Sequence, residues 1–193
     1  MPKVIVMNQV TLDGVMQGPG RPDEDTRDGF GHGGWAVPRS DELIQAKMGE
    51  LMGENWALLL GRRSYEGMLS AWNARGGRFK DALNAATKYV ASSSSTTTLE
   101  WPNSRLLHGD VPTAVADLRR NTPGNLVIMG SGQLIRSLLP HELIDEFLLM
   151  IHPLVLGTGQ RLFEHDRHGI TLRLVDCTAT TTGVILATYQ SPS

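Results

Sequence analysis

Short apolar runs alternate with amphipathic stretches along the chain, and this pattern predicts alternating strands and helices. The apolar runs predict strands at 4–10, 56–61, 87–91, 104–107, 126–129, 145–157, 171–178 and 183–190. Helical spacing of apolar residues, or a capping residue before them, predicts helices after Ser40-Asp41, from 62, over 78–85, after Asp110 and over 132–139. We therefore expect an α/β fold of three layers around a mixed, mostly parallel sheet, with an antiparallel C-terminal hairpin.

Residues 17–39 interrupt this pattern with a segment dense in Gly, Pro and Asp. That composition indicates a loop, and a loop of this length inside a compact domain is often functional. Its glycines would serve as hinges, so we expect a lid. Neither an internal repeat nor a second domain is indicated, and we predict a single domain over 1–193.

Composition excludes several classes of protein. The net charge is -2 and no block of like charges occurs, which argues against a nucleic-acid surface. The single cysteine, Cys177, excludes an internal disulfide framework and is expected to be a small buried residue of its strand. The N-terminal apolar run is too short for a signal peptide, and no stretch approaches the ~20 apolar residues of a membrane helix. We expect a soluble cytoplasmic protein with no membrane partner.

Three junctions that follow predicted strands share a chemistry suited to phosphate. Ligands of parallel sheets bind outside the carboxyl ends of the strands. Helix N-termini there present backbone amides to a phosphate, and arginines can form bidentate hydrogen bonds with it. Small residues allow the phosphate to come close to the backbone. The residues are Gly61, Arg62, Arg63 and Ser64 at the first junction, Ser92, Ser93 and Ser94 at the second, and Gly130, Ser131, Gly132 and Gln133 at the third. Together they predict a dinucleotide site, with a 2′-phosphate near Arg62, Arg63 and Ser92.

Each junction has an ordinary alternative meaning. The third lacks the last glycine of the GxGxxG motif, because Ile135 occupies that position, and a tight turn before a capped helix explains it equally well. Arg62 and Arg63 fit a solvated surface, and the serine run fits a plain loop. The joint occurrence of the three junctions favours the nucleotide interpretation.

The chain resembles the dihydrofolate reductase superfamily, and within it the stand-alone relatives of the C-terminal reductase domain of the bifunctional riboflavin-biosynthesis deaminase/reductase. The resemblance is carried by VTLDGV (10–15), LLLGRRSYEGM (58–68), KYVASSS (88–94), LVIMGSGQLIRSLL (126–139) and LIDEFLLMIHPLVLGTGQRLF (143–163). These stretches follow the order of the family and span nearly the whole chain.

The resemblance implies NADPH as cofactor and assigns residues to it by position. Arg62, Arg63 and Ser64 match the phosphate-contacting turn, Ser92 and Ser93 lie beside the 2′-phosphate, and Gly130–Gln133 match the pyrophosphate turn. Most relatives have Gly-Gly at that turn, so Ser131 is a departure. Asp13, Gly14 and Val15 match the stretch that edges the nicotinamide.

Fewer residues stand out on the substrate side. Trp35 is a candidate to stack on a substrate ring, with the alternative that it pins the 17–39 loop to the domain. Asp41 is a candidate to approach the substrate, although a first-turn acid more commonly complements the helix dipole. Asp13 is the candidate catalytic group, with the alternative that it serves a turn with Gly14. Hydride transfer requires few catalytic side chains, because the cofactor supplies the chemistry.

The predicted function is reduction of a small, heterocyclic substrate of pteridine or pyrimidine type by NADPH. The alternative is a non-catalytic nucleotide- or small-ligand-binding module on the same fold, and an enzyme of riboflavin biosynthesis itself ranks third. We expect no metal, because His165 and His168 fit a loop better than a ligand set. The resemblance also implies a homodimer, formed through the late strand and terminal hairpin.

Overall fold

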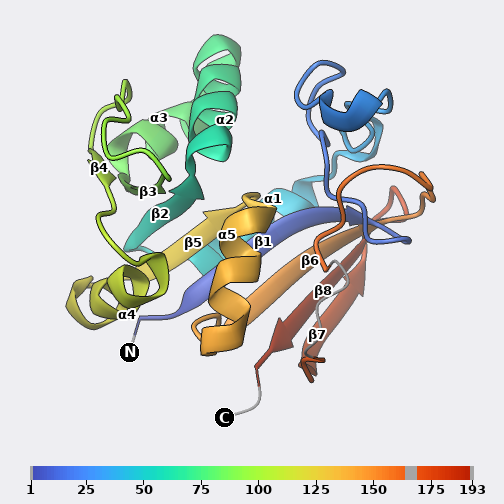
Figure 1. Cartoon of the computed structure of the whole chain (residues 1–193). Coiled ribbons are helices and arrows are strands. Elements are labelled where there is room, and N and C mark those ends of the chain that lie inside the picture. The colour runs from blue at the N-terminus through green and yellow to red at the C-terminus, as the bar shows by residue number, and fades with distance from the viewer. Residues whose placement is uncertain (1, 164–168, 192–193) are drawn as a thin grey trace. The chain divides into compact units, whose positions relative to one another are not determined.

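The computed structural model describes residues 2–163 and 169–191 (Figure 1). Its strands are β1 (Val4–Thr11), β2 (Trp56–Gly61), β3 (Thr87–Ala91), β4 (Ser104–Leu106), β5 (Asn125–Met129), β6 (Glu146–His152), β7 (Arg173–Ala179) and β8 (Ile185–Gln190). Its helices are α1 (Glu42–Met52), α2 (Arg62–Arg75), α3 (Arg78–Ala85), α4 (Val111–Asn121) and α5 (Gly132–Leu138), with short 3-10 turns η1 (Arg27–Gly29), η2 (Val37–Arg39) and η3 (Leu139–His141). Every predicted strand and helix is present. The pair His165 and His168 lies outside the described residues.

The strands form one eight-stranded sheet in the order β4-β3-β2-β5-β1-β6-β8-β7. β3 is parallel to β2 and to β4, and β2 is parallel to β5. β8 is antiparallel to both β6 and β7. The predicted fold class, a mixed and mostly parallel sheet with an antiparallel C-terminal hairpin, is confirmed.

The chain divides into two compact units, which we call unit 1 and unit 2. Unit 1 comprises the described residues up to Ile5 together with Met52–Ile144, and unit 2 comprises Val6–Leu51 together with the described residues from Asp145 onward. The prediction of one domain over 1–193 stays a prediction.

The parallel strands β2 and β5 form the core of unit 1. Their central residues have no exposed surface, in keeping with the near-continuous apolar runs typical of buried parallel strands; they are Leu58, Leu59, Leu60, Leu126, Val127 and Ile128. α4 begins as predicted, because the Asp110 carboxylate accepts a hydrogen bond from the amide of Thr113 at 3.0 Å.

A buried lysine joins α3 to β3 in unit 1. Lys88 is fully buried, and its Nζ donates to the carbonyl oxygens of Leu83, Asn84 and Ala86 at 2.6, 3.2 and 2.6 Å. A cation here satisfies the last carbonyls of a helix, which have no partner within it. Burial lowers the pKa of Lys88 to about 8. The contacts fix where α3 stops and β3 starts.

Unit 2 contains the antiparallel part of the sheet and shows one difference from the prediction. The strand expected over 145–157 is shorter, since β6 ends at His152. Pro153 has no amide to continue the ladder, and the chain turns there, with the amide of Leu154 donating to the carbonyl of His152 at 2.7 Å. The prediction that this strand continues through Pro153 to residue 157 is therefore wrong.

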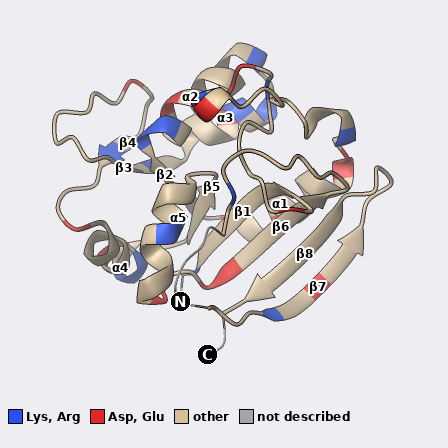
Figure 2. Cartoon of the chain, turned by 45° about the vertical axis from the view of Figure 1, so that its right-hand side comes forward, with Lys and Arg blue, Asp and Glu red and all other residues tan. Residues whose placement is uncertain are grey.

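β7 is one of the two edge strands of the sheet and is mostly exposed. Leu174 and Val175 are 51% and 46% exposed, and Cys177 is a free, exposed thiol, so the prediction of a buried cysteine is wrong. The reason is position: β7 pairs only with β8, whereas strands inside a sheet have a neighbour on each side. Its charged residues, coloured in Figure 2, are Arg173 and Asp176. The homodimer through this hairpin stays a prediction.

Candidate functional site

The first predicted junction of unit 1 places two arginines at the start of α2. β2 ends at Gly61, whose extended backbone makes it the N-cap of the helix. Arg62 and Arg63 follow and are exposed. Arg62 Nε lies 3.9 Å from Glu66 Oε1, and a surface pair at that distance contributes little energy. Among the described residues Arg63 has no ion pair, so both guanidinium groups are available to an anion.

The third junction is in contact with the first. After β5 the chain passes through Gly130 and Ser131 in the left-handed region, with φ of 71° and 67°. The hydroxyl of Ser131 accepts a hydrogen bond from the amide of Gly61 at 2.8 Å. A Cβ added to Gly130 would lie 3.5 Å from the Ser64 hydroxyl oxygen. The two turns predicted to bind phosphate therefore touch each other.

The second junction lies beside the first at the same edge of the sheet. β3 is parallel to β2, and Ala91 is the register partner of Gly61, so Ser92 follows directly at the carboxyl end. The hydroxyls of Ser92 and Thr97 are hydrogen-bonded at 2.7 Å, and the amide of Ser94 donates to Ser92 at 3.2 Å. These bonds close the serine loop on itself, while the Ser93 side chain is exposed. The three junctions of unit 1 thus follow adjacent parallel strands.

In unit 2, Asp13 holds two segments of the chain together. Its carboxylate accepts hydrogen bonds from the Thr11 hydroxyl at 2.6 Å and from the amides of Leu156 and Gly157 at 3.2 and 2.8 Å. The Thr11 hydroxyl and then these amides, working against partial burial, lower the pKa of Asp13 to about 2. Asp13 is therefore ionised near neutral pH, where it can stabilise charge and hold the 154–157 segment but has no proton to donate.

The two residues after Asp13 have roles in the turn and in packing. Gly14 has a φ of 80°, and the Val15 side chain is fully buried in a cluster with Phe30, Trp35 and Ala36. Gly159 makes this packing possible, because a Cβ there would lie 2.6 Å from the Phe30 ring. The predicted nicotinamide stretch therefore presents backbone rather than the Val15 side chain.

The predicted substrate residues Trp35 and Asp41 both make internal contacts. Trp35 is 7% exposed, and its Nε1 donates to the Gln17 carbonyl at 2.7 Å. Asp41 accepts from the amide of Leu43 at 2.9 Å and from the amide and hydroxyl of Thr181 at 3.1 and 2.7 Å. In this conformation Trp35 pins the loop, and Asp41 caps α1 and ties it to the β7–β8 turn.

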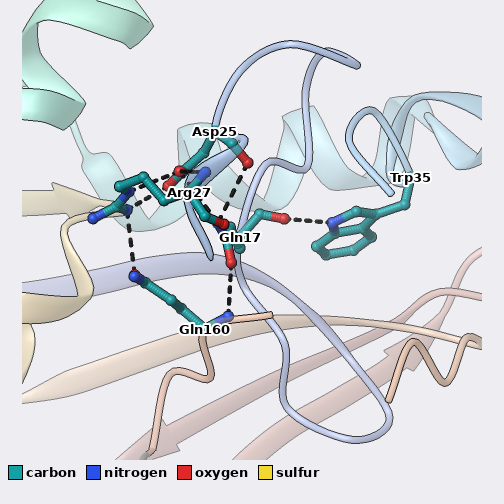
Figure 3. A network of polar contacts seen from close by, with 5 residues as sticks. All are labelled: Gln17, Asp25, Arg27, Trp35 and Gln160. Atoms are coloured by element: carbon teal, nitrogen blue, oxygen red, sulfur yellow. Dashed lines mark hydrogen bonds and ion pairs between the residues drawn. The ribbon is translucent and has the colours of Figure 1, made fainter. Parts of the chain in front are cut away.

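The 17–39 loop is organised around a glutamine that the sequence did not single out (Figure 3). Gln17 is buried; its Nε2 donates to the Asp25 carboxylate and to the carbonyls of Asp25 and Arg27, and its Oε1 accepts from the amide of Gln160 at 2.9 Å. The Arg27 guanidinium pairs with the Asp25 carboxylate and also donates to Gln160 Oε1 at 3.2 Å. Only the position of Gln17 at the start of the loop hinted at this role.

Replacing Gln17 with alanine should release the 17–39 loop. The change removes the hydrogen bonds of the buried Gln17 side chain to Asp25, Arg27 and Gln160, which costs about 2–3 kcal/mol. We expect limited trypsin digestion to cleave after Arg27 much faster than in the wild type. Gln45→Ala, an exposed glutamine of α1, is the matched control and should digest like the wild type. Equal digestion of the Gln17 variant would contradict this account of the loop.

A buried histidine of unit 2 contacts the loop through Trp35. His152 is 1% exposed, its Nε2 is hydrogen-bonded to Gln9 Oε1, and its ring meets Trp35 edge-on at 5.1 Å between centroids. Its Nδ1 has no hydrogen-bond partner among the described residues. Burial, with a smaller effect of the Arg39 charge, lowers the pKa of His152 to about 4. The imidazole is therefore neutral, and it supports the loop through Trp35.

No candidate metal centre or membrane span is found in the part of the chain that the structure describes. Within it, no three His, Cys, Asp or Glu side chains are grouped in a way that would hold a metal ion. None of its helices combines the length and the apolar character needed to cross a membrane.

Comparison with known proteins shows the family to which the chain belongs. The sequence model of the RibD C-terminal domain matches residues 2–186. The uncharacterized protein YyaP of Bacillus subtilis is 27% identical over 97% of this chain and 94% of its own length. Among solved structures, a protein assigned to riboflavin biosynthesis in Shewanella sp. PV-4 has a TM-score of 0.69 and 21% identity, covering 99% of each chain. Dihydrofolate reductase from Enterococcus faecalis, solved with NADP(H), has a TM-score of 0.65 and 15% identity, covering 99% of this chain and 97% of its own.

Proposed function

Because the chain belongs to the RibD C-terminal domain family, we propose that it is a reductase that uses NADPH to reduce a small heterocyclic substrate of pteridine or pyrimidine type. One observation carries the proposal. The three phosphate-suited junctions follow the adjacent parallel strands β3, β2 and β5, and two of them are in contact. The solved structures similar to this chain include reductases, and the Enterococcus reductase of the same fold was solved with NADP(H).

The residues of unit 1 fit the phosphate groups of such a cofactor. Arg62 and Arg63 are exposed, only weakly paired, and able to form bidentate hydrogen bonds with a 2′-phosphate. The turn at Gly130–Ser131, with φ of 71° and 67°, leads directly into the N-terminus of α5, and its small residues leave room for a pyrophosphate to approach the backbone. Ser64, Ser92, Ser93, Gly132 and Gln133 are proposed to complete the contacts.

The chemistry divides between cofactor and protein. When bound, the reduced nicotinamide supplies the hydride. The side chains of unit 1 bind and orient the phosphates. In unit 2, the ionised Asp13 carboxylate accepts a hydrogen bond from Thr11 in the stretch with Gly14 and Val15, which family membership associates with the nicotinamide. Since Asp13 is ionised, the proton that completes the reduction must come from another donor, such as water.

Titration with NADPH and NADH tests the proposal. We expect NADPH to bind at micromolar concentration, and NADH to bind at least about tenfold more weakly because it lacks the phosphate that Arg62 and Arg63 would grip. Loss of the reduced-nicotinamide absorbance across a panel of oxidised pteridines and pyrimidines would then identify the substrate. Absence of binding by either nucleotide at hundreds of micromolar would refute the proposal.

A nucleotide-binding module without turnover is the second candidate. The observation in its favour is that the carboxylates of Asp13 and Asp41, and the indole of Trp35, are all engaged in internal hydrogen bonds. Binding of NADPH without turnover of any compound in the panel would support this candidate instead.

A further inference from the structure

Resting on the proposed function, we propose that Ser131 is a positioning residue that sets the spacing of the two phosphate-binding turns of unit 1. Its hydroxyl oxygen accepts the hydrogen bond from the Gly61 amide at 2.8 Å. That bond joins the turn after β5, assigned to the pyrophosphate, with the turn after β2, assigned to the 2′-phosphate. The inference concerns the link between the turns and adds no new ligand contact.

The backbone at Ser131 indicates that the side chain has a specific use. Its φ of 67° and ψ of 54° lie in the left-handed region, which is unfavourable for any residue with a Cβ and free of cost for glycine. Strained residues of this kind persist where the surrounding structure holds them, and they cluster at binding sites. The bond to Gly61 is the interaction that a glycine at this position would lack.

The contact is also close enough to constrain both turns. A Cβ added to Gly61 would lie 3.4 Å from the Ser131 hydroxyl oxygen and 3.5 Å from its Cβ, so the two segments are packed together as well as hydrogen-bonded. Gly130 approaches the Ser64 hydroxyl from the same turn, with 3.5 Å between its added Cβ and that oxygen. Losing the bond should therefore let the turns separate without unfolding either helix.

A ligand that contacts both turns depends on their spacing, whereas a ligand that contacts one does not. NADPH carries a pyrophosphate and a 2′-phosphate and would engage both turns. Adenosine 2′-monophosphate lacks the pyrophosphate and would engage the arginine turn alone. Comparing the two ligands separates the positioning role of Ser131 from a general effect on folding.

The experiment uses Ser131→Ala and Ser131→Gly in the full chain. Both variants should bind NADPH about three- to tenfold more weakly than the wild type, the range expected for one hydrogen bond, with adenosine 2′-monophosphate affinity unchanged. Their stabilities should differ from each other, because alanine keeps the left-handed strain and glycine relieves it. Ser137→Ala is the matched control, since Ser137 bonds the Leu134 carbonyl at 2.7 Å in the same helix. It should leave both affinities unchanged.

Two results would overturn the inference while the wild type still binds NADPH. In the first, both variants bind NADPH like the wild type. In the second, affinity follows stability, with the alanine variant weakened for both ligands and the glycine variant normal, which would make Ser131 purely structural. A wild type that binds neither nucleotide would refute the proposed function, and this inference with it.

Discussion

Replacing Arg62 or Arg63 with alanine is expected to weaken NADPH binding by about 10- to 100-fold and to change NADH binding little. Hydrogen bonds between charged groups contribute roughly 1.5–3 kcal/mol, and about 1.4 kcal/mol corresponds to a tenfold change in affinity. Both guanidinium groups start exposed, so little existing interaction is lost when they turn to a phosphate. Titration of each variant with both nucleotides at constant salt measures the effect.

A third arginine of the same helix provides the control. Arg75, in the last turn of α2, lies over the Trp72 ring at 5.0 Å and far along the helix from the β2 junction. Arg75→Ala should leave the affinity for both nucleotides unchanged. If Arg62→Ala and Arg63→Ala weakened the affinities for NADPH and NADH equally, the arginines would be assigned to the pyrophosphate, which both nucleotides share. If neither affinity changed, the turn at the start of α2 would not be part of the nucleotide site.

The second large effect is a loss of stability in mild acid caused by His152. Its pKa is lowered from 6.5 to about 4 in the folded protein, so the unfolded chain binds the proton more readily. Stability is therefore highest above pH 6.5 and falls as the pH drops toward 4, by about 3 kcal/mol in total for this group. Urea unfolding followed from neutral pH down to about 4 measures this slope.

A variant that keeps the hydrogen bond but cannot titrate isolates this effect. His152→Gln retains an N–H donor for Gln9 and should remove most of the slope between pH 6.5 and 4. Both proteins should still lose stability in stronger acid, because Asp13, with its pKa lowered from 3.8 to about 2, contributes stability that is lost only there. An unchanged slope in the variant would show that His152 is not the group responsible.

The fold was predictable from the sequence because local pattern and tertiary structure agree over most of the chain. The run Trp56–Gly61 is a strand as predicted, and the α3 helix occupies the predicted residues 78–85. β6 was overestimated, because apolar residues continue beyond Pro153 although the ladder cannot. The burial of Cys177 was predicted wrongly, because a Thr-rich strand has the same sequence pattern whether it lies inside a sheet or at its edge.

The candidate site was predictable in unit 1 and only partly in unit 2. In unit 1 every candidate follows a strand of a parallel set, so the topology alone brings Gly61, Ser92 and Gly130 to one edge. In unit 2 the decisive contacts join residues more than a hundred positions apart, such as Asp13 with Gly157 and Gln17 with Gln160. Nothing in local spacing identifies such partners.

Local sequence pattern was enough to assign the strands, the helices and the turns with phosphate-suited residues, because periodicity and residue type act over a few neighbours. The contacts of those side chains could be known from the folded chain alone. It buried Trp35, committed the Asp13 carboxylate to backbone amides and joined Ser131 to Gly61. These outcomes depend on burial and on hydrogen-bond partners from distant segments, which exist only once the chain has folded.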